Sequence, residues 1–220
     1  MKILVCVKQV PDTTEIKIDP VTNTLIRAGV PSIVNPFDAC ALEVAARIKD
    51  VTPDTEITVL SMGPMQAKEA LTECLAVGAD KAYLCSDRVF GGSDTLATSY
   101  ILASAIAAIE EKEGKFDLIF SGKQAIDGDT GQVGPEIAAH MGLAQVTYAS
   151  EVKMCIRDRQ SIFGRMRCRS FLLFRQWGPP DFIMTVWLRT LWKREKRSRC
   201  FLIWCMKWKQ SDRLWALPLM

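Results

Sequence analysis

Short apolar segments alternate with helical segments through the first two thirds of this chain, and that alternation limits the folds open to it. Unbroken apolar strands separated by helices pair in parallel and are buried on both faces. The sequence therefore predicts an α/β fold, with an open, mainly parallel sheet and helices on both faces. Strands are predicted over residues 1–10, 56–62, 81–86 and 116–121, helices over 36–50, 65–77, 95–111 and 135–141, and a short hairpin over 16–19 and 24–26.

The predicted helices carry capping residues at their ends. Asn35 precedes Pro36 at the start of the first helix, where an asparagine cap and a proline in the first position are both favoured. Gly78 closes the second helix, and Ser93 or Asp94 caps the third. These boundaries place the strand-to-helix loops at the carboxyl edge of the sheet, where α/β folds bind ligands.

The composition changes abruptly near Lys153. Residues 1–153 hold 13 Lys and Arg against 21 Asp and Glu, whereas residues 154–220 hold 15 against 4, together with all six tryptophans. The tail has no regular helix or strand period, and residues 154–159, "MCIRDR", resemble translated sequencing-adapter sequence. We interpret residues 154–220 as an aberrant tail without native fold, arising from a frameshift or an adapter. A basic tail that binds nucleic acid or acidic lipid is the alternative, but its spacing matches no known nucleic-acid module.

The composition also limits the class of protein. No segment reaches the ~18 unbroken apolar residues of a membrane span, so we expect no membrane insertion. No secretory signal opens the chain, and its eight cysteines indicate a reducing, cytoplasmic compartment. We expect Cys6, Cys40, Cys74 and Cys85 to be buried as small apolar residues. His140 lies in an Ala-rich helical stretch and supports neither a catalytic triad nor a metal site.

The loop over residues 122–136 follows an apolar strand and opens a helix. Its glycines allow a phosphate to approach the backbone, and the free amides at the helix start, with Thr130, can hold phosphate oxygens. Asp127 and Asp129 could repel that anion, bind a metal, or orient the amides of the loop. The loop is neither a Walker A motif nor a dinucleotide fingerprint. A plain strand-to-helix turn is the alternative.

Two further loops point to a nucleotide. In residues 91–99, Thr95 and Thr98 share one face of a helix, where their hydroxyls can hold a diphosphate. An ordinary capped helix is the alternative there. Residues 7–12 end the first strand and residues 35–38 begin the first helix, so these segments should meet and could contact an adenine edge through backbone groups.

No catalytic set emerges from the sequence. It shows no pairing of a nucleophile with histidine, no cluster of metal ligands and no pair of carboxylates for acid–base work. A nucleotide binder without such groups fits a cofactor carrier, in which the protein supplies position and electrostatics. We therefore expect no catalytic residues and no metal.

Several long motifs, in order, resemble the β subunit of electron-transfer flavoproteins. They are "KILVCVKQVPDT", "NPFDACALE", "LSMGP", "CLAVGADKAYL", "FGGSDTLATS" and "GKQAIDGDTGQVGPEIA", and they cover residues 1 to about 153. The resemblance implies an open α/β sheet of the adenine-nucleotide-binding type. It also implies that residues 1–153 form a nucleotide- or flavin-binding domain that pairs with an α subunit in a heterodimer.

In that family the β subunit holds either AMP or a second FAD. The segment "DTLATS" resembles the form found in electron-bifurcating members, and this favours FAD over AMP. The resemblance, with the loops above, assigns the cofactor-binding residues to Cys6, Val7, Lys8, Asn35, Phe37, Asp38, Met62, Asp94, Thr95, Thr98, Gln124, Asp127, Gly128, Asp129, Thr130, Gly131, Gln132, Val133 and Gly134.

The resemblance implies an electron carrier that is active only with its α subunit. The complex is expected to carry electrons between NADH or acyl-CoA dehydrogenases and acceptors such as ferredoxin, flavodoxin or quinone-linked oxidoreductases. The family's second half, with its acidic signature, is not found in residues 154–220. An ATP-binding sensor resembling the universal stress proteins is the alternative, although its glycine pattern differs from that of residues 122–134.

Overall fold

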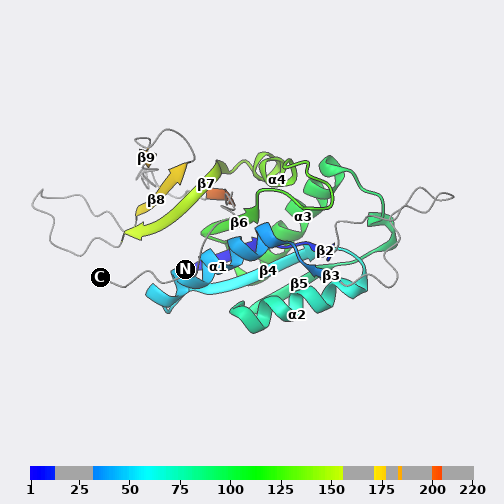
Figure 1. Cartoon of the computed structure of the whole chain (residues 1–220), viewed down its shortest axis with the longest axis horizontal. Helices are drawn as coiled ribbons and strands as arrows, with labels where there is room; N and C mark the ends of the chain where they lie inside the picture. The colour runs from blue at the N-terminus through cyan, green and yellow to red at the C-terminus, as the bar shows by residue number, and fades with distance from the viewer. Residues whose placement is uncertain (13–31, 156–170, 177–182, 185–199, 205–220) are drawn as a thin grey trace, which may run out of the picture.

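The structure is a computed structural model that describes residues 1–12, 32–155, 171–176, 183–184 and 200–204 (Figure 1). The expected hairpin over residues 16–19 and 24–26 lies outside the described residues. The elements are β1 (Lys2–Cys6), β2 (Gln9–Pro11), β3 (Ser32–Val34), α1 (Pro36–Val51), β4 (Glu56–Met62), η1 (Met65–Ala67), α2 (Lys68–Val77), β5 (Lys81–Cys85), η2 (Arg88–Phe90), α3 (Thr95–Glu113), β6 (Leu118–Gly122), α4 (Val133–Met141), β7 (Ala144–Cys155), β8 (Phe171–Gln176), β9 (Ile183–Met184) and β10 (Cys200–Trp204).

One large sheet organises the described part of the chain. Its strand order is β5-β4-β1-β6-β10-β7-β8-β9, and β2 and β3 pair separately as an antiparallel ribbon. The pairs from β5 to β7 are parallel, whereas β8 and β9 are antiparallel additions at the far edge. The predicted α/β class with a mainly parallel sheet is confirmed.

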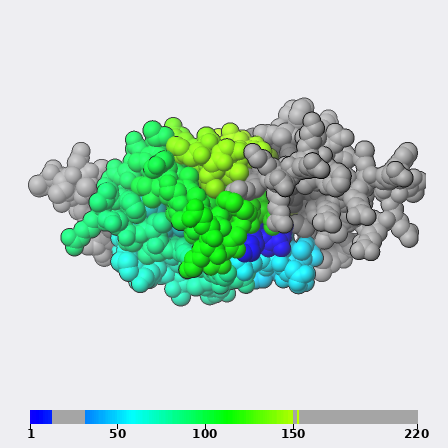
Figure 2. All heavy atoms as spheres, turned by 180° about the vertical axis from the view of Figure 1, so that it is seen from behind, coloured from blue at the N-terminus to red at the C-terminus, as the bar shows by residue number. Residues whose placement is uncertain are grey.

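Helices cover both faces of this sheet. Ile3 and Val5 of β1 belong to an apolar cluster with buried residues of α1 and α2. Leu4 and Cys6, on the opposite face of the same strand, pack with buried residues of α3 and α4. Seen from behind, green atoms of the segment that includes α3 occupy the middle of the surface, beside blue atoms near the N-terminus (Figure 2). Each face of β1 is therefore part of a separate hydrophobic core.

Several element boundaries differ from the predicted ones. The strand expected over residues 1–10 is divided between β1 and β2, because the chain leaves the large sheet after Cys6. The helix expected over 65–77 opens with one turn of 3-10 helix, and α4 begins at Val133, two residues before the predicted start. The bounds of β4 match the prediction.

The region after Lys153 is described only in part. The backbones of β8 and β9 extend the sheet beyond β7, and that of β10 lies between β6 and β7. Residues 156–170, 177–182, 185–199 and 205–220 lie outside the described residues. The boundary at Lys153 and the absence of a native fold in the tail stay predictions.

The direction of chain progression reverses at β1. The chain runs outward from β1 to β4 and β5, then returns through α3 to β6 on the other side of β1. Such a reversal leaves a crevice at the carboxyl ends of the two central strands, because their connections leave on opposite faces. None of the helices in the described ranges combines the length and hydropathy needed to cross a membrane.

Candidate functional site

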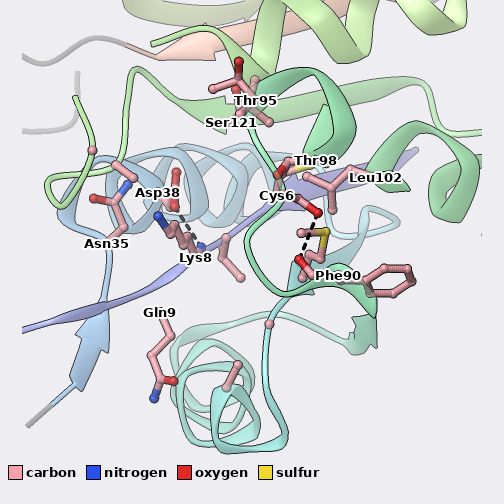
Figure 3. A pocket seen from close by; sticks show the side chains of 18 of the residues that line it. Cys6, Lys8, Gln9, Asn35, Asp38, Phe90, Thr95, Thr98, Leu102 and Ser121 are labelled. Atoms are coloured by element: carbon pink, nitrogen blue, oxygen red, sulfur yellow. Dashed lines mark hydrogen bonds between the residues drawn. The ribbon is translucent and has the colours of Figure 1, made fainter. Parts of the chain in front are cut away.

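A cavity of about 900 Å³ lies at the carboxyl ends of β1, β4, β5 and β6. This is the position that the strand order predicts for a ligand, and the volume is within the range of small-molecule and cofactor sites. Figure 3 shows Asn35 and Asp38 from the α1 side of the cavity and Thr98 and Leu102 from α3. The cavity therefore lies where helices from both faces of the sheet converge.

The structure brings most of the predicted cofactor-binding residues around this one cavity. Phe37, Asp127 and Asp129 are the three that do not line it. The sixteen that do are Cys6, Val7, Lys8, Asn35, Asp38, Met62, Asp94, Thr95, Thr98, Gln124, Gly128, Thr130, Gly131, Gln132, Val133 and Gly134. Three loops that are far apart in sequence thus form one concave surface.

Asp38 joins three elements below the cavity. Its carboxylate accepts hydrogen bonds from the backbone amides of Lys8 and Gly122, each at 2.9 Å. Those amides follow β1 and end β6, while Asp38 itself lies in the first turn of α1. The side chain is buried, so water cannot replace these bonds. Asp38 therefore fixes the distance between the two central strand ends.

Burial raises the pKa of the Asp38 carboxyl from 3.8 to about 7, against the opposing effect of hydrogen bonds from Asn35, Lys8 and Gly122. Between these values the folded chain binds more protons than the unfolded chain, so the free energy of unfolding falls as pH rises from about 4 to about 7. Urea unfolding across this range tests the prediction. Asp38→Asn should remove this component of the pH dependence, and an unchanged slope in that variant would contradict it.

Asn35 connects α1 to the loop after β6. The expectation that its side chain caps α1 is wrong: it makes no capping hydrogen bond. Instead its Nδ2 donates to the Gln124 carbonyl at 2.8 Å, and its Oδ1 accepts from the Ile126 amide at 3.3 Å. Asn35 is 1% exposed, so both polar atoms of its side chain need partners. The loop offers a carbonyl for Nδ2 and an amide for Oδ1, whereas a helix start offers amides alone.

The two loop carboxylates are held away from the cavity. Lys8 Nζ contacts both oxygens of Asp127, at 2.7 and 2.9 Å, and Gln124 Nε2 donates to Asp129 at 2.5 Å. Asp129 and Gly131 have φ values of 51° and 63°, the left-handed conformation that turns successive amides toward one side. Lys8 thus neutralises the Asp127 carboxylate, and neither Asp127 nor Asp129 belongs to the cavity wall.

The starts of α3 and α4 approach each other across the cavity. Asp94 caps α3 by accepting from the Ala97 amide at 2.8 Å, which confirms one of the two predicted caps. Thr95 Oγ1 donates to Gln132 Oε1 at 3.0 Å, so the first turn of α3 is tied to the residue before α4. Thr98 also lines the cavity. The two helix N-termini offer donors to an anion placed between them.

The described residues contain no group of His, Cys, Asp and Glu arranged to hold a metal ion. Cys6 lines the cavity, but burial and the nearby Asp38 raise the pKa of its thiol, so the thiol stays neutral. His140 lies on α4 with its ring against Tyr100 of α3, a structural contact. The described side chains around the cavity can bind and orient a ligand, and none of them is an activated nucleophile.

Sequence reasoning missed part of the cavity wall. Arg88 and Phe90 of η2, Leu102 of α3 and Ser121 of β6 all line it. Leu102 and Ser121 carried no usable signal, because one belongs to a helical apolar stripe and the other to a strand. Arg88 lies three residues before Gly91, the first residue of the loop over residues 91–99, and could have been found as a cation beside an expected phosphate site.

Comparison with known proteins places the matching region in one family. Residues 22–167 match the electron transfer flavoprotein domain. An electron transfer flavoprotein subunit beta of Megasphaera elsdenii is 63% identical over 156 residues, which are 70% of this chain and 58% of that protein. Subunit CarD of the caffeyl-CoA reductase-Etf complex of Acetobacterium woodii is 58% identical over 165 residues, 75% of this chain and 61% of the relative.

A third relative, protein FixA of Azorhizobium caulinodans, is 53% identical over 152 residues, 69% of this chain and 54% of its own length. The chain thus spans less than two thirds of each of these relatives. The domain match runs past Lys153 to residue 167. The motifs that resemble the family's β subunits all end before Lys153.

Proposed function

This chain belongs to the electron transfer flavoprotein family, among the relatives of its β subunits, and we propose that it holds an adenine nucleotide for electron transfer. The single observation that supports this most strongly is the cavity of about 900 Å³ at the reversal of the strand order. Its walls offer loop amides, two helix N-termini and hydroxyls rather than acid–base pairs. These are the groups that hold phosphates and position a cofactor.

We propose that the nucleotide is FAD, with AMP as the alternative. The residues present fit either group, because the cavity joins the loop after β6 to the start of α3. AMP needs only the part of the cavity near β1 and that loop, whereas FAD has a second phosphate and a flavin to accommodate. Thr98 adds a hydroxyl for that second phosphate, and Thr95 adds another when its hydrogen turns from Gln132 Oε1 to the phosphate. Phe90 adds an apolar wall.

In this proposal the side chains of the cavity bind and orient the nucleotide. The Lys8–Asp127 pair and the Asn35 bonds hold the loop after β6 against β1, so that its amides keep one direction. The neutral thiol of Cys6 and the side chain of Leu102 exclude water from the floor. A bound flavin would supply the capacity to accept and release electrons, which no side chain here provides.

The partners belong to the proposal as well. We propose a heterodimer with an α subunit, located in the cytoplasm. The pair would carry electrons between NADH or acyl-CoA dehydrogenases and ferredoxin, flavodoxin or quinone-linked oxidoreductases. The relative CarD is named as a subunit of a caffeyl-CoA reductase complex, which supports a role beside an acyl-CoA-related enzyme. We propose no nucleic-acid partner and no membrane insertion.

The choice between FAD and AMP can be tested with Thr95→Val and Thr98→Val combined. Two lost hydroxyl bonds to a charged group should weaken FAD binding roughly tenfold or more and leave AMP binding within about threefold. Fluorescence titration with FAD, and competition with AMP, measure this. Ser104→Ala, on the exposed face of α3, is the control and should change neither. Equal losses for both nucleotides would contradict the proposed role of the two threonines.

The redox role itself is tested by coexpression with an α subunit. We expect a yellow complex that oxidises NADH in the presence of an acyl-CoA dehydrogenase or ferredoxin. A chain that copurifies with ATP and without flavin would overturn the proposal and favour the sensor alternative.

A further inference from the structure

Ser121 has a buried hydroxyl with no hydrogen-bond partner. The residue is 7% exposed, and its Oγ makes no hydrogen bond within the described structure. A buried hydroxyl without a partner costs free energy, and most such groups in folded proteins are paired. Because Ser121 also lines the cavity, its missing partner can come from a bound molecule.

The position of Ser121 in β6 defines the side of the sheet on which that partner would lie. It pairs in register with Cys6 of β1, two residues beyond Ile119 on the same face of β6. Ile119 packs with buried residues of α3 and α4, so Ser121 faces the side of the sheet on which these helices begin. Figure 3 shows Ser121 among the cavity residues drawn with Cys6 and Thr98.

The start of α4 lies on the same wall and lacks a side-chain cap. Gln132, which precedes α4, makes no capping hydrogen bond, whereas Asp94 caps α3. Val133 and Gly134 of the first turn line the cavity. The carboxylate of Glu136 lies in the same turn, but that residue is not part of the cavity wall. Uncapped amides and a buried hydroxyl donor together favour an anion.

We propose that Ser121 Oγ donates a hydrogen bond to a phosphate oxygen of the nucleotide, which the first amides of α4 hold at the same time. This inference rests on the proposed function and adds a specific contact to it. A serine can turn its hydroxyl among three staggered χ1 positions, so the donor can meet the phosphate without backbone movement.

The test is Ser121→Ala in the full chain, with Ser61→Ala as a matched control. Ser61 of β4 is also buried, at 1% exposed against 7% for Ser121, and its hydroxyl is also unpartnered, but it does not line the cavity. Without nucleotide, both variants should melt about 2 °C or more above wild type, because each loses an unpaired buried hydroxyl. Only Ser121→Ala should bind AMP roughly tenfold or more weakly.

Calorimetric titration with AMP and with adenosine separates the outcomes. The proposal expects Ser121→Ala to weaken AMP binding while adenosine binding stays within about threefold of wild type. Equal losses for both would place the contact on the nucleoside and overturn the phosphate assignment. AMP affinity equal to wild type in Ser121→Ala would overturn the contact itself. If wild type binds neither AMP nor FAD, the proposed function fails instead.

Discussion

Replacing Gly122 with alanine is expected to destabilise the fold by about 3 kcal/mol or more and to abolish nucleotide binding. A Cβ at this position would overlap the Asp38 carboxylate and lie 2.7 Å from the Phe37 carbonyl carbon and 2.8 Å from the Asp38 nitrogen. Two of these three contacts are with backbone, which cannot rotate away. The end of β6 and the start of α1 would have to separate, and the cavity lies between the loops that they support.

Gly128→Ala is the matched control for this substitution. Gly128 lies in the loop that follows Gly122 and lines the same cavity, and a Cβ added there would meet no atom within 4 Å. We expect its free energy of unfolding to stay within about 0.5 kcal/mol of wild type. Urea unfolding followed by circular dichroism measures both variants. Similar stability of Gly122→Ala and Gly128→Ala would refute the close approach of β6 to α1.

Asp38→Ala is expected to cost about 2–4 kcal/mol at neutral pH. The substitution leaves the amides of Lys8 and Gly122 buried without an acceptor, and each orphaned amide costs about 1–3 kcal/mol. Relief from burying the carboxylate offsets part of this loss. Because these amides border the cavity on two sides, nucleotide affinity should fall with the stability.

Asp117→Ala provides the comparison at the opposite end of β1. Asp117 accepts from the Lys2 amide at 2.9 Å, the same type of contact in a partly exposed setting. Water can replace that acceptor, so we expect a loss of about 1 kcal/mol and unchanged nucleotide affinity. A smaller loss for Asp38→Ala than for Asp117→Ala would mean that Asp38 is not the link between the strand ends.

The large elements of the fold could be predicted because their signals are local. The five apolar or β-branched residues among the seven of β4, and the cap and apolar stripe of α3, lie within short stretches of sequence. The exit of the chain after Cys6 could not be predicted, because nothing in residues 7–10 separates a continued strand from a strand of another sheet. The position of β10 between β6 and β7 is equally non-local.

The candidate site likewise combines features that the sequence predicts with features that it does not. The glycine loop and the threonines of α3 predict a phosphate site through residue type and spacing alone. The role of Asp38 depends on Gly122, 84 positions away, and that of Asn35 depends on a loop about 90 positions away. Only the packed structure shows that these two side chains support the cavity from below.

The most direct test of the account is a calorimetric titration of the full chain with FAD and with AMP. We predict one bound nucleotide per chain, tighter binding of FAD than of AMP, and loss of both in Gly122→Ala. Tighter binding of AMP would contradict the assignment to a flavin. Absence of heat with either nucleotide would contradict the claim that this cavity holds an adenine nucleotide at all.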